Sequence, residues 1–138
     1  MSRTFFPPTL EVLQKNLALR MARHQVLTSN ITNAETPGYI AKDVSFEAAL
    51  RDAAQPPSHN TLQRTHLRHL PVVARSVAQV QGVLVASPSD NVGSDLNTVS
   101  LDQEMGRLTL NAFHYNTSIE FLGRSLDQLR RVISEGGR

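Results

Sequence analysis

The sequence predicts a mainly α-helical protein whose long N-terminal and C-terminal helices pack together as a helical bundle or coiled coil. Two observations predict this class. Apolar residues recur at steps of three and four near both ends of the chain, which is the spacing of one helix face. Proline, glycine and serine repeatedly interrupt the segment between the two ends. We therefore divide the 138 residues into 1–54, 55–99 and 100–138, and expect the terminal helices to form one structural domain.

The C-terminal segment carries the most regular pattern of the chain. Ser100 is the predicted N-cap of its helix, with Gln103 completing a capping box, and Gly136 and Gly137 end the helix. Full burial of a large apolar side chain is worth about 1.5–3 kcal/mol, so we expect other helices to cover the apolar seam. This seam has the a and d spacing of a coiled coil and comprises Leu101, Met105, Leu108, Ala112, Tyr115, Ile119, Leu122, Leu126, Leu129 and Ile133.

The N-terminal helix starts after a pair of prolines, with Thr9 as its predicted N-cap. Arg20 and His24 interrupt its apolar seam, and we expect the neighbouring Met21 to fill the gap. The seam itself comprises Leu10, Leu13, Leu17, Leu27, Ile31 and Ala34. A second apolar row, which we expect to remain open to other chains, comprises Val12, Leu19 and Val26.

A turn must end the N-terminal helix shortly after residue 34. Residues 36–39 predict a type II turn, because Pro37 presets φ at the second position and Gly38 supplies a positive φ at the third. We expect this corner to set the angle at which the chain leaves the helix. Asn30 and Asn33 are then expected to satisfy backbone groups at the helix end.

The segment after the turn is less regular. Residues 43–54 predict a short helix capped by Asp43 or Ser45, and extended structure over residues 40–46 is the competing interpretation. Residues 55–99 contain short β-branched stretches between turn residues, which predict loops with one hairpin or a few short strands.

The two terminal helices differ in length. At 1.5 Å per residue, residues 10–34 form a helix of about 37 Å and residues 101–133 one of about 48 Å. They can pair within one chain or between chains, but they cannot cover each other completely. This mismatch favours assembly, since a self-contained helical hairpin has helices of matching length.

Composition and motifs argue against several classes of function. The net charge is only +2 and the cationic residues are dispersed, so a nucleic-acid-binding surface is not expected. The absence of cysteine excludes disulfides and thiolate metal sites. His59, His66 and His69 are better interpreted as loop residues than as metal ligands. No nucleophile elbow, dinucleotide-binding motif or P-loop occurs, so we expect neither an enzyme nor a cofactor or small-molecule substrate.

The chain also lacks the patterns of membrane insertion. Residues 1–8 contain no apolar run of signal-peptide length, and no stretch approaches the roughly 18 apolar residues of a membrane span. If the protein leaves the cytoplasm, we expect it to do so without a cleaved signal peptide.

The end of the N-terminal helix carries a resemblance to a known family. An Asn-x-x-Asn helix end that runs into Thr-Pro-Gly-Tyr resembles the signature of bacterial flagellar rod and hook proteins, here formed by Asn30, Asn33, Thr36, Pro37, Gly38 and Tyr39. Residues 42–50 and 97–105 are similar to those of the proximal rod members of this family. The resemblance covers roughly the first fifty and last forty residues. It departs at Thr32, where the family more often has alanine.

This resemblance implies a structural role. It implies a subunit of the proximal rod in the periplasm, exported through the flagellar type III apparatus and assembled by its terminal helices into a tubular drive shaft that transmits torque. The implied partners are further copies of the chain, FlgC and neighbouring rod proteins, the membrane ring and the export gate. A cytoplasmic helical adaptor is the alternative. The predicted subunit-interface residues are Leu10, Leu13, Leu17, Leu27, Ile31, Leu101, Met105, Leu108, Ile119, Leu122, Leu126, Leu129 and Ile133.

Overall fold

A computed structural model describes residues 8–55, 76–87 and 95–136 of the chain. It confirms a mainly α-helical fold with two long terminal helices, a short middle helix and a small antiparallel sheet. The elements in chain order are α1 (Pro8–Thr32), β1 (Lys42–Ser45), α2 (Glu47–Ala54), the 3₁₀ helix η1 (Val77–Gln79), β2 (Val83–Ala86) and α3 (Leu101–Glu135).

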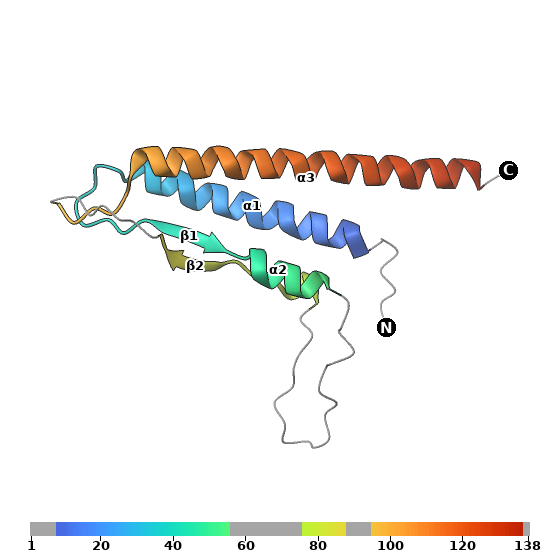
Figure 1. Cartoon of the computed structure of the whole chain (residues 1–138), viewed down its shortest axis with the longest axis horizontal. Coiled ribbons are helices and arrows are strands. Elements are labelled where there is room, and N and C mark those ends of the chain that lie inside the picture. The colour runs from blue at the N-terminus through green and yellow to red at the C-terminus, as the bar shows by residue number, and fades with distance from the viewer. Residues whose placement is uncertain (1–7, 56–75, 88–94, 137–138) are drawn as a thin grey trace, which may run out of the picture.

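The two long helices of one chain pack against each other in antiparallel orientation (Figure 1). Asn30 near the end of α1 contacts Glu104 near the start of α3, whereas Asn16 contacts Ser118. The pairing therefore forms within the chain. Because α3 has 35 residues and α1 has 25, the C-terminal end of α3 extends past the start of α1, as the length comparison predicted (Figure 1).

The two strands lie on the side of α1 opposite α3, and β2 is further from the helices than β1 (Figure 1). They pair antiparallel, with Lys42 opposite Ala86 and Ser45 opposite Val83. A strand in residues 55–99 is confirmed, but its partner β1 precedes this segment. The strands are therefore not a local hairpin.

The helix predicted over residues 43–54 is wrong at its start. It begins at Glu47, and the competing extended conformation occupies residues 42–45 as β1. Neither Asp43 nor Ser45 is the N-cap; Phe46 occupies that position without a side-chain cap hydrogen bond. The extended conformation prevails because the backbone of β1 bonds to β2 on one side and to the side chain of Asn30 on the other.

Two predicted helix caps also differ from the structure. α1 already begins at Pro8, so Thr9 lies inside the first turn and is not the N-cap. Proline is tolerated at the first position of a helix because a backbone N–H there would have no intrahelical partner. Ser100 does occupy the N-cap position of α3, but its side chain makes no cap hydrogen bond, so the predicted capping box does not form.

A small apolar core joins α1 to the sheet and to α2. Its buried members are Leu19, Val44, Phe46, Leu50 and Val80, and Val26 packs against it. The expectation that Leu19 and Val26 remain open to other chains is therefore wrong, because the chain's own middle segment covers them. Gly82 must be glycine here, since a Cβ at this position would collide with Cγ1 of Val44.

Among the described residues, no helix is long and apolar enough to cross a membrane.

Candidate assembly interface and its supporting corner

The contact between α1 and α3 is centred on a row of polar residues. The buried residues of α3 are spaced by seven positions and are all polar, namely Glu104, Asn111 and Ser118. Each forms a hydrogen bond with α1: Asn30 Nδ2 donates to Glu104 Oε2 (2.8 Å), Asn111 Nδ2 to the carbonyl oxygen of Arg20 (2.9 Å), and Asn16 Nδ2 to Ser118 Oγ (3.1 Å). We call this set the polar row. Buried polar pairs of this kind fix the register of a helix pair, because a shifted register leaves them unsatisfied.

This polar row divides the predicted apolar seam of α3. Successive residues on a helix lie about 100° apart, so the column one position after the polar row is rotated away from the hydrogen-bonded face of α3. Ala112 in this column is still half-buried beside α1, whereas the larger seam residues are exposed. The exposed fractions there are 49% for Met105, 44% for Ile119, 47% for Leu126 and 75% for Ile133. We call these four residues the open column. The seam residues on the other side of the row are half-buried: Leu108, Tyr115, Leu122 and Leu129.

The remaining predicted interface residues are placed differently. Leu10 and Leu27 are already buried by the chain's own packing, with exposed fractions of 6% and 0%. Leu13, Leu17 and Ile31 are half-buried on α1. Leu101, at the start of α3, is 52% exposed. The free apolar surface of the helix pair therefore belongs mainly to α3.

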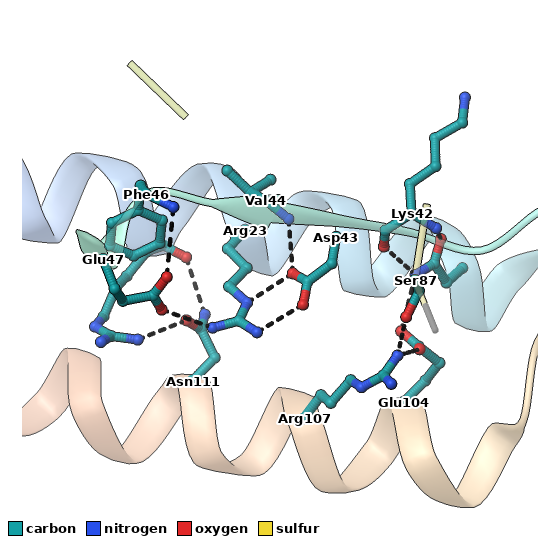
Figure 2. A network of polar contacts seen from close by, with 12 residues as sticks. Arg23, Lys42, Asp43, Val44, Phe46, Glu47, Ser87, Glu104, Arg107 and Asn111 are labelled. Atoms are coloured by element: carbon teal, nitrogen blue, oxygen red, sulfur yellow. Dashed lines mark hydrogen bonds and ion pairs between the residues drawn. The ribbon is translucent and has the colours of Figure 1, made fainter. Parts of the chain in front are cut away.

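Glu104 connects three elements (Figure 2). Its Oε2 accepts the hydrogen bond from Asn30 of α1, and its Oε1 accepts one of 2.6 Å from Arg107 Nη1. Arg107 also donates to the hydroxyl of Ser87, which follows β2. Glu104 is 1% exposed, and a buried charge is costly unless it is paired. These contacts pair the carboxylate with a cation and give each of its oxygens a hydrogen bond.

Asn30 serves β1 as well as α3. Its Nδ2 donates to the carbonyl oxygen of Lys42 (2.7 Å), and its Oδ1 accepts from the Lys42 N–H (3.1 Å). The amide thus completes the hydrogen bonds of β1 as a neighbouring strand would. The expectation that Asn30 satisfies the end of α1 is wrong, because its side chain points to β1 and α3 instead. Asn33 does contact the helix end, donating to the carbonyl oxygen of Ser29 (2.8 Å).

The predicted turn at the end of α1 is present. The Tyr39 N–H donates to the carbonyl oxygen of Thr36 (3.3 Å), and Gly38 has a φ of +70°. Segment 95–98 lies alongside, since the Gly38 N–H donates to the carbonyl oxygen of Asp95 (2.9 Å). A positive φ is unfavourable for residues with a Cβ, so Gly38 is the residue that this turn requires.

The residue that caps the end of α1 was not predicted. The Nδ2 group of Asn97 lies 2.8 Å from the carbonyl oxygen of Ala34, 2.9 Å from that of Thr36 and 3.1 Å from that of Asn33. Asn97 is 5% exposed, so its amide is buried against the end of α1 and supplies a donor to carbonyl groups that have no partner within the helix. Its position, more than 60 residues later in the chain, gives no local signal of this role.

Arg20 is the polar interruption predicted in the seam of α1. It is 9% exposed, and its guanidinium lies 5.4 Å from the ring centroid of Phe46. Burial lowers its pKa, and its Nε finds no hydrogen-bond partner among the described residues. Met21 does not fill this place: it is 45% exposed and lines an open hollow of about 170 Å³ between α1 and α3, together with His24.

Arg23, one turn later, is fully paired (Figure 2). Its Nε and Nη2 donate to the two oxygens of Asp43 at 2.7 and 2.6 Å, and its Nη1 donates to Glu47 Oε1 at 3.0 Å. Burial alone would lower the pKa of Arg23, but the hydrogen bonds to Asp43 and the negative charges of Asp43, Glu47 and Glu104 together raise it. This bidentate pair attaches α1 to β1 and α2.

The structure offers no candidate metal centre in its described part. Within residues 8–55, 76–87 and 95–136, no group of three or more histidine or acidic side chains is arranged to hold a metal ion. His59, His66 and His69 lie outside the described residues.

Comparison with known proteins decides the family. No protein family model matches the sequence. The flagellar basal body rod protein FlgB of Escherichia coli (strain K12) is 32% identical over 133 residues, covering 92% of this chain and 94% of that protein. FlgB of Salmonella typhimurium is 32% identical and FlgB of Yersinia enterocolitica 31% identical, each over 131 residues and with the same coverage. The chain belongs to the FlgB family of flagellar basal body rod proteins.

This membership confirms the resemblance found at the end of α1. As a FlgB family member, the chain is a structural subunit of the flagellar basal body rod, and a cytoplasmic helical adaptor is not favoured. Membership also gives the exposed apolar residues of α3 a context, since a rod subunit assembles with other rod components.

Proposed function

We propose that this FlgB family member is a subunit of the proximal rod, and that α1 and α3 together form one element of the wall of a tubular drive shaft. In this proposal the protein transmits torque and has no catalytic role. It reaches the periplasm through the flagellar export apparatus without a cleaved signal peptide. Its neighbours are further copies of the chain, FlgC and other rod proteins, the membrane ring and the export gate.

The observation that carries this proposal is the open column of α3. Hydrogen bonds of the polar row hold α3 in one rotation relative to α1, and this rotation leaves Met105, Ile119 and Leu126 about half exposed. Apolar side chains at this spacing fit the surface of a neighbouring helix. Each subunit of a tube presents different surfaces to its two neighbours, which is a heterologous contact. An unpaired column on one helix supplies one side of such a contact.

A pair of acidic substitutions tests the open column. Ile119→Asp combined with Leu126→Asp places two charges on it, so we expect the chain to be lost from purified basal bodies and the cells to lose motility. Both residues are about half exposed, so the isolated protein should keep its helix content and its melting temperature within a few degrees.

The matched control uses exposed apolar residues of α3 outside the open column. Leu110 and Phe113 are 61% and 64% exposed, and Leu110→Asp with Phe113→Asp adds the same charge. We expect this control to enter basal bodies more efficiently. Equal incorporation of both double variants would contradict the assignment of the open column as a subunit interface.

A further inference from the structure

The small sheet has two edges, and among the described residues the outward backbone groups of β1 are mostly paired whereas those of β2 are not. The Ser87 N–H donates to the carbonyl oxygen of Ala41 (2.8 Å), and this pair directly continues the register of Lys42 opposite Ala86. Bonded and non-bonded pairs alternate along an antiparallel ladder. The backbone groups of Asp43, Ser45, Val83 and Val85 therefore face the partner strand. The backbone groups at the alternate positions, which are Lys42 and Val44 in β1 and Leu84 and Ala86 in β2, face outward.

Three of the four outward groups of β1 have partners among the described residues. Asn30 bonds both the N–H and the carbonyl oxygen of Lys42, and the Val44 N–H donates to Asp43 Oδ1 (2.7 Å). The outward groups of β2 belong to Leu84 and Ala86. They have no hydrogen-bond partner among the described residues. β2 lies on the outside of the molecule, with its free edge directed away from α1 (Figure 1).

The side chains of β2 are also unusual for an exposed edge. All four residues are apolar and exposed, with exposed fractions of 61% for Val83, 60% for Leu84 and 39% for Val85. Residues 80–87 contain no charged side chain. Proteins commonly protect free edges with charges, proline or bulges, and among the described residues β2 has only its short length as protection.

We propose that the free edge of β2 is a docking site for an extended, uncharged segment of a different rod subunit, which adds to the sheet as a third strand. An extended segment supplies the alternating donors and acceptors that Leu84 and Ala86 lack, as in other cases of β-strand addition. The absence of charge on residues 80–87 selects an uncharged partner. This inference rests on the proposed function, because that function brings other subunits close.

A second β2 strand is a poorer occupant. Antiparallel pairing of β2 with its own copy is an isologous contact, which closes after two chains and cannot extend a rod. A four-residue edge also buries far less than the roughly 1,200 Å² of a stable interface. The strand addition therefore depends on the terminal helices, which bring the two different subunits together.

Leu84→Pro tests this edge selectively. Proline removes the outward N–H of Leu84 and fills its place with a ring, but it leaves the bonds of Val83 and Val85 to β1 intact. Leu84→Ala is the matched control, because it shortens the side chain and keeps the N–H. In a deletion strain, we expect Leu84→Ala to enter basal bodies and Leu84→Pro to be reduced by at least tenfold. The isolated variants should have the same helix content and melt within a few degrees of each other.

Amide hydrogen exchange on the unmodified chain gives a second test that does not depend on the proline variant folding. Peptides containing residues 84 and 86 should exchange rapidly in the isolated protein and slowly in purified basal bodies. Equal incorporation of the proline and alanine variants, together with rapid exchange in both states, would overturn the docking proposal. A soluble dimer that Leu84→Pro abolishes would overturn the choice of a different subunit. Absence of the unmodified chain from basal bodies would instead refute the proposed function.

Discussion

The side-chain amide of Asn30 donates a hydrogen bond of 2.8 Å to the buried carboxylate of Glu104, 74 residues further along the chain. Asn30 belongs to the family signature at the end of α1, whereas Glu104 lies in the first turns of α3. The same amide bonds both backbone groups of Lys42. One asparagine therefore joins α1, α3 and β1, and it links the signature to the rotation of α3 that leaves the open column exposed.

Replacement of Glu104 tests this connection. Glu104→Ala removes the buried carboxylate that accepts hydrogen bonds from Asn30 and Arg107. Loss of one partner of a buried charged pair costs about 3 kcal/mol. We expect the free energy of unfolding, measured by urea denaturation of the isolated protein, to fall by about this amount.

The control for this prediction is Glu120→Ala on the same helix. Glu120 approaches Arg124 only at 3.9 Å, and its side chain is 71% exposed, so its removal should cost about 0.5 kcal/mol or less. If the two alanine variants unfold at the same urea concentration, Glu104 does not hold α1 and α3 together.

Gly38 gives a prediction that depends on backbone conformation alone. A Cβ at this position would have no atom within 4 Å, so Gly38→Ala introduces no collision, but its φ of +70° should cost about 1 kcal/mol. Thermal unfolding of the isolated protein measures the loss.

Gly106→Ala makes the same change in the middle of a helix. Its Cβ would also meet nothing within 4 Å, and alanine is favoured over glycine in a helix by about 0.5–1 kcal/mol. The two substitutions should therefore shift the melting temperature in opposite directions. A shift in the same direction would show that the positive φ of Gly38 is not a source of strain.

Asn97 offers a test of the cap that sequence analysis missed. Asn97→Asp keeps the Oδ1 acceptor used by the Val99 N–H, but it replaces the Nδ2 donor by an oxygen that faces the carbonyl groups of Ala34 and Thr36. The carbonyl oxygen of Thr36 keeps its bond from the Tyr39 N–H, but that of Ala34 loses its side-chain donor and both face a new carboxylate oxygen, which together should cost about 2 kcal/mol of unfolding free energy. Asn116→Asp, at an exposed position of α3, is the control and should change it by about 0.5 kcal/mol or less. Equal losses would contradict the capping role.

Local patterns predicted the features that local physics determines. The seam of α3 follows from helix periodicity, and the turn at Gly38 follows from the restricted φ of Pro37 and the freedom of glycine. These requirements involve residues close together in the sequence, so they can be read from it directly.

The rotation of α3 could not be predicted in this way. Both sides of its seam are apolar, so periodicity alone does not say which side faces α1. Hydrogen bonds over long sequence distances decide it, including that from Asn111 to the backbone of Arg20, 91 residues away. The signal was available as polar residues at every seventh position, Glu104, Asn111 and Ser118, but it becomes meaningful only when their partners are known. The same reason explains why β1 was partly predicted as helix, since Asn30 and β2 are both distant in sequence.

Arg20 and Arg23 provide the final prediction, because they lie on the same helix and are both largely buried, yet only one is fully paired. Arg23→Met leaves Asp43 without its cation, and the side chain of Asp43 is only 16% exposed, so the free energy of unfolding should fall by about 2–3 kcal/mol. Arg20→Met instead removes a guanidinium whose Nε has no described partner and whose hydrogen bond to Asn111 is long, at 3.4 Å.

Replacing a poorly paired buried charge by an apolar side chain is often neutral or stabilising. We therefore expect Arg20→Met to leave the unfolding free energy within about 1 kcal/mol of the unmodified protein, or to raise it, in the same urea titration. The variant also loses the cation–π contact with Phe46, worth about 0.5–2 kcal/mol, and we expect relief from burying the poorly paired charge to offset most of this loss. If Arg20→Met is as destabilising as Arg23→Met, Arg20 stabilises the helix pair itself. If it is not, stability alone does not account for an arginine in the seam of α1, and its effect on rod assembly becomes the measurement that decides its role.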